Sequence, residues 1–183
     1  KLRFDFTCAH PVAPEELGQV EDKVRKAIAD NLQVYAEIAP QKQARAITGL
    51  RAVFGEAYPD PVRVVSIGVP VPRLLANPTS EEWKRYSIEF CGGTHVASTG
   101  DIGDFVLAFE EGIAKGVRRV VALTGVPARA SIAAANELER RVRAAESLDG
   151  TALTDELASI AAQVDQMELP ASRKHAIRTS LAQ

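Results

Sequence analysis

The sequence predicts an α+β fold, with a mainly antiparallel sheet covered by helices and an all-helical C-terminal extension. Three observations favour this class. The 183 residues are 46% apolar and 25% charged, a composition typical of a globular protein. Before residue 125, segments with strand and helix periodicity alternate. Residues 126–183 contain no aromatic residue and one glycine but fourteen alanines, which favours helices. We therefore expect one domain at residues 1–125 and a helical connector at residues 126–183.

The first elements are predicted to be a helix, a strand and a second helix. Pro14, followed by two glutamates, suits a first helical turn, because that turn leaves amides unpaired and its positive end favours acids. Apolar residues then recur at helical spacing as far as Asn31, at Leu17, Val20, Val24 and Ile28. Alternation at residues 34, 36 and 38 predicts a strand, and Pro40 opens a shorter helix that fades by Gly49.

The next segment is predicted to supply most of the sheet. Residues 62–68 are rich in β-branched side chains and predict a buried strand. Prolines and polar residues at 69–85 predict a surface excursion, which Trp83 anchors. Alternating apolar residues predict strands at 86–90 and 105–109, and residues 117–123 predict the last strand.

The C-terminal part is predicted to contain two helices. Pro127 opens the first, whose apolar residues recur every three or four positions before Gly150: Ala135, Leu138, Val142 and Ala145. A second series continues the spacing: Leu153, Leu157, Ile160, Val164 and Met167. Two heptads are too few to specify a stable coiled-coil dimer. An antiparallel hairpin, or a strut to a further domain, is therefore expected, and self-association through these helices stays open.

Charge and composition exclude several classes of function. The net charge of −2 provides no overall attraction to DNA or RNA, so RNA binding requires a local patch. No apolar run approaches the ~20 residues that span a membrane. Two cysteines cannot form a disulfide scaffold, which favours a reducing compartment such as the cytoplasm. The chain starts at Lys1 and resembles a piece of a longer protein, so an organellar form stays open.

The densest chemical signal is Cys91-Gly92-Gly93-Thr94-His95, directly after a predicted strand. Thiolate and imidazole are preferred zinc ligands, and a helical turn would place both on one side. The glycines would let a ligand approach the backbone closely. The alternative is a buried cysteine at a strand end beside an unrelated histidine. A zinc ion needs three or four ligands, so these two side chains would hold it only in part.

Further polar residues could contribute to a site. Cys8 and His10 could complete a Cys2His2 site, although a loop after the first strand is their simpler interpretation, and His175 is expected in solvent. Two adjacent arginines, Arg118 and Arg119, follow Lys115 and Gly116 and could form a phosphate-binding corner with them. The alternative is that both arginines are solvated. Asp101 is expected to be a turn residue rather than a partner of a ligand histidine.

Five sequence blocks occur in one order and together carry a family resemblance. They are Leu2-Arg3-Phe4-Asp5-Phe6, Leu50-Arg51-Ala52-Val53-Phe54-Gly55-Glu56, Glu89-Phe90-Cys91-Gly92-Gly93-Thr94-His95, Thr99-Gly100-Asp101-Ile102-Gly103 and Gly116-Val117-Arg118-Arg119-Val120. Residues 1–125 thereby resemble the editing domain of alanyl-tRNA synthetases, and the tail resembles the helical connector that follows it. The long segment at 69–85 is similar to that of eukaryotic-type members.

The resemblance implies an enzyme that hydrolyses serine or glycine wrongly esterified to tRNA(Ala). A pocket shaped for alanine cannot exclude glycine by size and rejects an added hydroxyl poorly, by roughly 10². Zinc would be held by Cys91 and His95, both catalytic, together with an H-x-x-x-H helix that lies upstream of Lys1. Activation of water and positioning of the substrate are both open roles for the metal. The resemblance further implies ATP binding by the full-length ligase. The residues expected to contact substrate or tRNA are Gly92, Gly93, Thr94, Arg118 and Arg119.

Other functions stay open beside this one. A free-standing editing protein of the same superfamily is the first alternative, and a non-catalytic module for tRNA docking or dimerisation is the second. A threonyl-type editing domain is less favoured, because Gly92, Gly93 and Thr94 between the two ligands are of the alanyl type.

Overall fold

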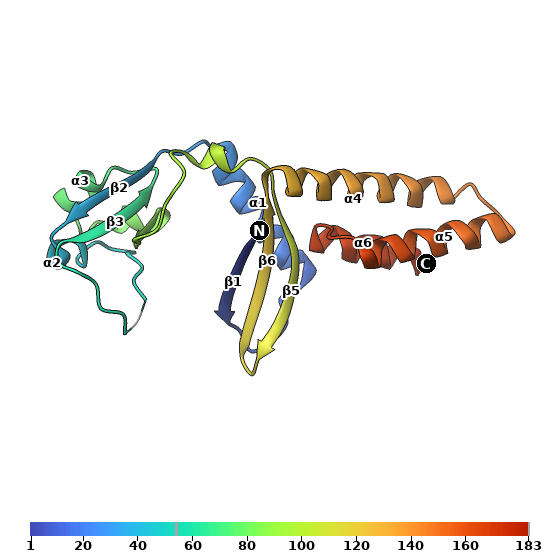
Figure 1. Ribbon diagram of the computed structural model, residues 1–183, viewed down its shortest axis with the longest axis horizontal. Coiled ribbons are helices and arrows are strands. Elements are labelled where there is room, and N and C mark those ends of the chain that lie inside the picture. Colours follow the sequence, from blue (N-terminus) through green and yellow to red (C-terminus); the bar gives the residue numbers. More distant parts are fainter. Residues whose placement is uncertain (54, 183) are drawn as a thin grey trace. The chain divides into compact units, whose positions relative to one another are not determined.

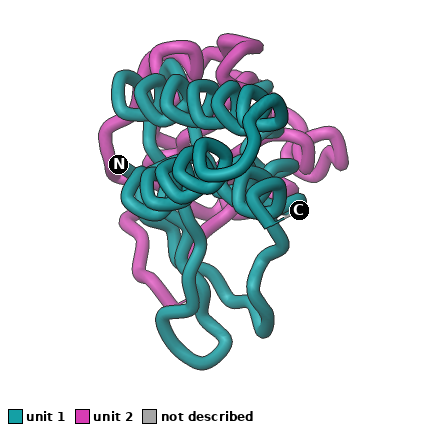
Figure 2. Tube along the Cα trace, turned by 90° about the vertical axis from the view of Figure 1, so that its right-hand side faces the viewer, with its two compact units in different colours: residues 1–26, 103–183 teal, residues 27–102 magenta. Residues whose placement is uncertain are grey.

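The computed structural model describes residues 1–53 and 55–182, which form two compact units (Figure 2). One unit combines residues 1–26 with the chain from residue 103 onward, and the other comprises residues 27–102. Each contains a three-stranded antiparallel sheet, so the predicted α+β class is confirmed. The functional boundary predicted at residue 125 stays a prediction. Phe54, part of one family block, lies outside the described residues.

The first unit is built on the sheet β1-β6-β5, with β6 in the centre. The strands are β1 (Leu2–Thr7), β5 (Phe105–Ala114) and β6 (Val117–Thr124). A tight connection at Lys115 and Gly116 joins β5 to β6. The register shifts between Leu107 and Phe109, which marks a bulge. The predicted alternation along β5 is not borne out by its burial, because residues 105–108 are all buried and Phe109 is exposed.

Helix α1 (Pro14–Ala29) begins where the sequence predicts, but its buried face differs from the predicted one. Leu17 and Glu21 are buried, whereas Val20 is 47% exposed. The reason is a hydrogen bond 2.7 Å long, in which the Leu107 amide donates to the Glu21 carboxylate. Burial raises the pKa of Glu21, while that hydrogen bond and the neighbouring Arg25 oppose the shift.

The C-terminal part forms three helices, one more than predicted: α4 (Gly125–Ala145), α5 (Gly150–Gln166) and α6 (Ala171–Leu181). Figure 1 shows α5 returning alongside α4, as the hairpin prediction requires. The three helices share an apolar core, and Met167 at the end of the predicted series is 40% exposed. A bidentate pair at 2.7 and 2.8 Å joins Arg173 of α6 to Glu139 of α4. The core residues are Ala135, Leu138, Ile160, Val164, Leu169 and Ile177.

The second unit is built on the sheet β2-β3-β4. Its strands are β2 (Val34–Ala39), β3 (Val62–Ile67) and β4 (Ser87–Phe90). The helices α2 (Gln41–Ala44) and α3 (Val71–Ala76) and two 3₁₀ turns, η1 (Glu81–Arg85) and η2 (Thr99–Ile102), complete it. Each strand lies where the sequence predicts, because β-branched and alternating residues specify extended chain locally.

The segment at residues 69–85 is not the predicted surface excursion. It folds back over the sheet and buries Val69, Val71 and Leu74 in the core of this unit. Trp83 anchors it, as predicted, because the indole is 2% exposed and donates a 2.7 Å hydrogen bond from Nε1 to the Asn77 carbonyl. Apolar residues between prolines here serve the core rather than the surface.

The two faces of this sheet differ in character. One face packs against the core through residues such as Tyr35, Ala39 and Ile88. The alternation at 34, 36 and 38 predicted the strand correctly; these residues lie on the face opposite the core, and Ile38 is 62% exposed. The second face carries Glu89 and, one pleat further, Cys91, so the chemical residues lie opposite the core.

Candidate functional site

Three metal-ligating side chains converge at the end of β4. One ligand atom from each of Glu89, Cys91 and His95 lies within 4.8 Å of the other two. Glu89 and Cys91 are half-buried and His95 is exposed, so the group is accessible from solvent. The predicted pair of Cys91 and His95 thus meets in space. Glu89 was missed, although residues two apart on an extended chain share a face and the pattern Glu-Phe-Cys could have indicated it.

The loop at residues 91–97 contains no helical turn, contrary to the prediction for this segment. Cys91 continues the pairing of β4 with β3, because its amide donates to the Arg63 carbonyl at 3.3 Å. His95 reaches the thiol through the course of the loop rather than through helical periodicity. A Cβ at Gly92 would meet nothing within 4 Å, and one at Gly93 would meet only the Cys91 sulfur, at 3.6 Å. The two glycines therefore leave the space beside the sulfur open.

Hydrogen bonds hold the start of this loop to β3. Arg63 donates from Nη1 to the Cys91 carbonyl at 2.9 Å and to the Gly93 carbonyl at 2.6 Å. The end of the loop is held to β2, since the Val34 amide donates to the Ala97 carbonyl at 2.9 Å. Both ends of the segment that carries the ligand atoms are therefore tied to the same sheet.

A buried threonine reinforces the far end of the loop. Thr99 Oγ1 accepts from the Leu32 amide at 2.8 Å and donates to the Ala27 carbonyl at 2.6 Å. Asn31, at a positive φ of 46°, accepts at Oδ1 from the Ser98 hydroxyl at 2.7 Å. These bonds satisfy backbone groups where helix α1 ends, and they fix the chain just after His95.

The donor set fits a zinc ion. Carboxylate, thiolate and imidazole are the three side-chain ligands that zinc takes in proteins. A tetrahedral ion with bonds of about 2.0–2.3 Å separates its ligands by roughly 3.3–3.8 Å, so a spacing within 4.8 Å requires only small side-chain movements. Cys8 and His10, with Sγ and Nδ1 4.0 Å apart, lie in the other unit, and no third donor joins them among the described residues.

Comparison with known proteins matches the region of the chain that contains this site. Residues 62–121 match the family described as the threonyl and alanyl tRNA synthetase second additional domain. This stretch includes β3, β4, Cys91 and His95. Over nearly its whole length the chain is also similar to complete ligases. It is 47% identical over 179 residues to the mitochondrial alanine–tRNA ligase of Saccharomyces cerevisiae, covering 97% of this chain and 18% of that protein.

The chain matches a segment of alanine–tRNA ligases that carries the second additional domain. The alanine–tRNA ligase of Schizosaccharomyces pombe is 45% identical over 183 residues, covering all of this chain and 19% of that relative. The cytoplasmic alanine–tRNA ligase of Dictyostelium discoideum is 46% identical over 160 residues, covering 87% and 17%. The chain thus spans about a fifth of the length of these relatives. None of its described helices is long and apolar enough to cross a membrane.

Both arginines predicted to contact tRNA are paired with carboxylates in the first unit. They point to opposite faces of β6, as their adjacency predicts. Arg118 forms a bidentate pair with Glu110, in which Nη2 and Oε2 are 2.8 Å apart. Arg119 pairs with Asp5 at 2.7 and 2.8 Å. The Arg118 side chain is 18% exposed and that of Arg119 is 31% exposed, so Arg119 is the more accessible of the two.

The remaining candidates take the simpler of their predicted roles. Asp101 is a turn residue, because its carboxylate accepts from the Ser98 amide at 3.0 Å. His175 on α6 and Thr94 in the loop are exposed. Lys115 is exposed and Gly116 half-buried in the β5–β6 connection.

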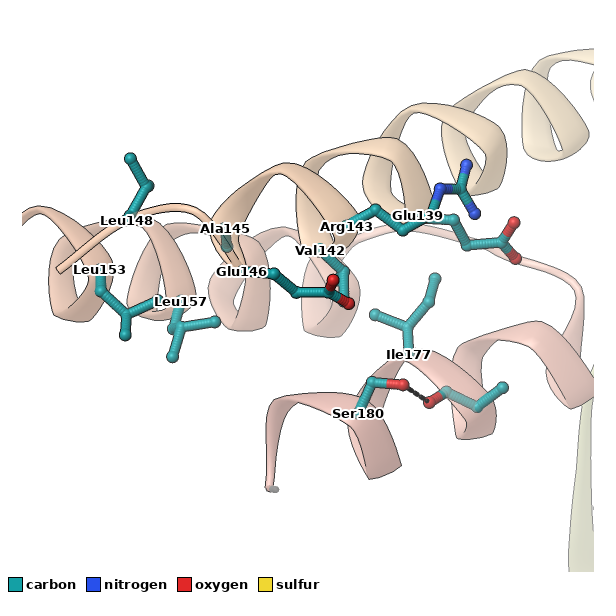
Figure 3. Close-up of a pocket in the computed structure, with 11 residues that line it drawn as sticks. Glu139, Val142, Arg143, Ala145, Glu146, Leu148, Leu153, Leu157, Ile177 and Ser180 are labelled. Atoms are coloured by element: carbon teal, nitrogen blue, oxygen red, sulfur yellow. Dashed lines mark hydrogen bonds between the residues drawn. The ribbon is translucent and has the colours of Figure 1, made fainter.

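A separate apolar hollow lies among the C-terminal helices (Figure 3). It encloses about 510 Å³ and is lined by leucines of α5 and the preceding turn, with Val142 of α4 and Ile177 of α6. Charged residues such as Glu146 lie at the same hollow, but it contains no cysteine or histidine. The hollow is suited to apolar contact rather than to chemistry.

Proposed function

We propose that this chain is the proofreading part of an alanine–tRNA ligase, which hydrolyses the ester of serine or glycine wrongly joined to tRNA(Ala). The observation that carries the proposal is the convergence of Glu89, Cys91 and His95 inside the stretch that matches the synthetase second additional domain. Hydrolytic sites commonly combine such ligands around a metal.

We propose that Glu89, Cys91 and His95 hold a zinc ion, with further ligands from outside this chain. When bound, a zinc ion would supply Lewis-acid chemistry, which could activate water or position the ester carbonyl. The chain's own residues set the surroundings. Because Gly92 and Gly93 carry no side chains, the terminal nucleotide of a tRNA can approach the backbone beside the thiol. Exposed Thr94 lies within the same loop and would line the pocket.

The contact with the rest of the acceptor end is proposed for Arg119 rather than for Arg118. Either guanidinium must exchange its carboxylate for a phosphate, and the exchange is easier for the more exposed pair. ATP-dependent charging and a cytoplasmic location are proposed for the whole protein, in line with relatives named as ligases, one of them as cytoplasmic.

The test uses the full-length protein and purified seryl-tRNA(Ala). We expect Cys91→Ala to reduce hydrolysis to the background rate while alanine charging stays intact. Cys8→Ala is the matched control, because that thiol lies in the other unit, and it should hydrolyse at the wild-type rate. Unchanged hydrolysis in Cys91→Ala would remove the thiol from the mechanism and with it the proposed site.

A free-standing editing protein would perform the same hydrolysis, and the similarity of the entire chain to complete ligases favours the synthetase.

A non-catalytic role in self-association is supported by the apolar hollow among the helices. Leu153 and Leu157 line it, so Leu153→Glu should lower the mass measured by analytical ultracentrifugation if this surface joins two copies. An unchanged mass in that variant would exclude the hollow as a dimer interface.

A further inference from the structure

We propose that Arg63 is a positioning residue of the hydrolytic site, whose guanidinium sets the conformation of the loop that carries Cys91 and His95. The inference rests on the proposed function and adds a residue to it. Arg63 is the only charged residue in the run at 62–68, where every other side chain is apolar or small and uncharged. A charged side chain in a central strand calls for a specific partner.

The register places Arg63 directly opposite the loop. The Cys91 amide donates to the Arg63 carbonyl at 3.3 Å, so the two residues oppose each other across β3 and the continuation of β4. Opposed residues of an antiparallel pair send their side chains to the same face. The guanidinium therefore lies on the face that also carries Glu89 and the thiol.

Among the described residues, the side-chain hydrogen bonds of Arg63 run to the loop backbone alone. One nitrogen, Nη1, donates to the carbonyls of Cys91 and Gly93 at 2.9 and 2.6 Å. One nitrogen that donates to both carbonyls holds them close together, and the chain bends at Gly93. Because one partner is charged, each of these bonds is stronger than a bond between neutral groups. The bend directs the following residues back toward the sulfur, where His95 joins the group.

Several arginines of this chain serve as ion-pair partners, which Arg63 does not among the described residues. Arg118, Arg119, Arg141 and Arg173 each bind a carboxylate with two hydrogen bonds. Arg63 makes no ion pair with any carboxylate among the described residues. Its position and its carbonyl contacts are therefore specific to the loop and are not part of a general charge network.

The test compares Arg63→Gln, Arg63→Lys and Arg45→Gln in the full-length protein. Arg45 is the matched control because it lies in the same unit and stacks over the rings of Tyr58 and Phe90, at 5.9 and 5.5 Å, on the core side of the sheet. Four quantities are measured: the kcat and the KM of seryl-tRNA(Ala) hydrolysis, the affinity for Co²⁺ from its thiolate charge-transfer band, and the melting temperature.

We expect Arg63→Gln to lower kcat and Co²⁺ affinity about tenfold or more, as the loss of groups that orient metal ligands does. KM should change less than kcat, since the ligand atoms rather than the tRNA surface move. Arg63→Lys should restore part of the kcat and part of the Co²⁺ affinity, because an ammonium can also donate to two carbonyls. Arg45→Gln should match the wild type in hydrolysis and in Co²⁺ affinity.

Two results would overturn the proposal. One is wild-type hydrolysis and Co²⁺ affinity in Arg63→Gln. The other is a loss of hydrolysis and Co²⁺ affinity in Arg63→Gln that comes with a lowered melting temperature and is not restored in Arg63→Lys. That result would assign Arg63 to general stability. The Cys91→Ala variant separates this proposal from the function itself. If Cys91→Ala abolishes hydrolysis and Arg63→Gln does not, only the positioning role fails; if Cys91→Ala still hydrolyses, the function fails.

Discussion

Glu89 and Cys91 present a carboxylate and a thiol on the same face of the sheet, because only Phe90 separates them on an extended chain. Phe90 between them points into the core. The strand thus alternates ligand, core residue and ligand, and the extended backbone sets the spacing of both donors. The third donor, from His95, arrives through a loop tied to the sheet at both ends.

Glu89→Gln should weaken metal binding. An amide is a poorer zinc ligand than a carboxylate, so we expect the Zn²⁺ affinity of the full-length protein to fall at least tenfold in competition with a chromophoric chelator. Glu37→Gln is the control, since Glu37 is exposed on β2 of the same sheet. Equal affinities of the two variants would show that Glu89 is not a ligand.

Thr99→Val should destabilise the unit at residues 27–102. Valine has the same shape but leaves the Leu32 amide and the Ala27 carbonyl without their partner, at a cost of about 1–3 kcal/mol. Urea unfolding followed by Trp83 fluorescence measures the change. Thr48→Val is the control, because the Thr48 hydroxyl makes no hydrogen bond among the described residues. A Thr99→Val protein as stable as Thr48→Val would contradict the anchoring role.

The Glu110–Arg118 pair should make stability depend on acid pH. The Arg118 guanidinium holds the pKa of Glu110 below its ordinary value of 4.5. A lowered pKa contributes stability that is present above about pH 4.5 and is lost as the pH falls through the pKa of the folded state. Glu110→Gln cannot titrate, so its thermal midpoint should fall less steeply with acid than that of the wild type.

The control for that pH dependence is Glu137→Gln. Glu137 pairs with Arg140, which also lowers the pKa of Glu137, but both side chains are mostly exposed. Salt should screen the contribution of Glu137 and leave that of the buried Glu110 largely intact. An acid profile of Glu110→Gln that overlays the wild type would show that the pair does not couple to folding.

Arg119→Gln should reduce the salt dependence of tRNA binding, and Arg118→Gln should not. A lost phosphate contact lowers the slope of log affinity against log salt by about 0.7–1. Fluorescence anisotropy with a labelled tRNA(Ala), at several salt concentrations, gives the slope. Arg118 is expected to act on stability instead, because its carboxylate partner is only 6% exposed. Identical slopes in the wild type and both variants would place the tRNA contact elsewhere.

Ile160→Ala should act on the first unit only. Ile160 is fully buried among the C-terminal helices, and its truncation costs about 2–5 kcal/mol. Helix unfolding, followed by far-ultraviolet circular dichroism, should shift to lower urea. The single tryptophan, Trp83, belongs to the other unit, so its fluorescence transition should stay in place. A shift of both transitions together would show that the two units unfold as one.

Several elements could be predicted because their causes are local. Pro14 and the acids after it mark the start of α1, and β-branched residues mark β3. The burial of Glu21 in place of Val20 could not be predicted, because it depends on an amide 86 residues away at Leu107. Helix α6 was missed because its exposed side chains leave a weak apolar pattern, with Ile177 as its one buried residue.

By itself, the sequence determined which groups could do chemistry: a thiol and an imidazole four residues apart, with an overlooked carboxylate two residues before them. Side-chain type and spacing along the chain are enough for that. Only the tertiary structure decided that these groups meet and that both candidate arginines have carboxylate partners. It also decided that Arg63 donates hydrogen bonds to carbonyls of the loop. The contacts of the arginines join different strands through the pairing register of the folded sheets, and His95 meets the thiol through the course of a loop that the sheet holds at both ends.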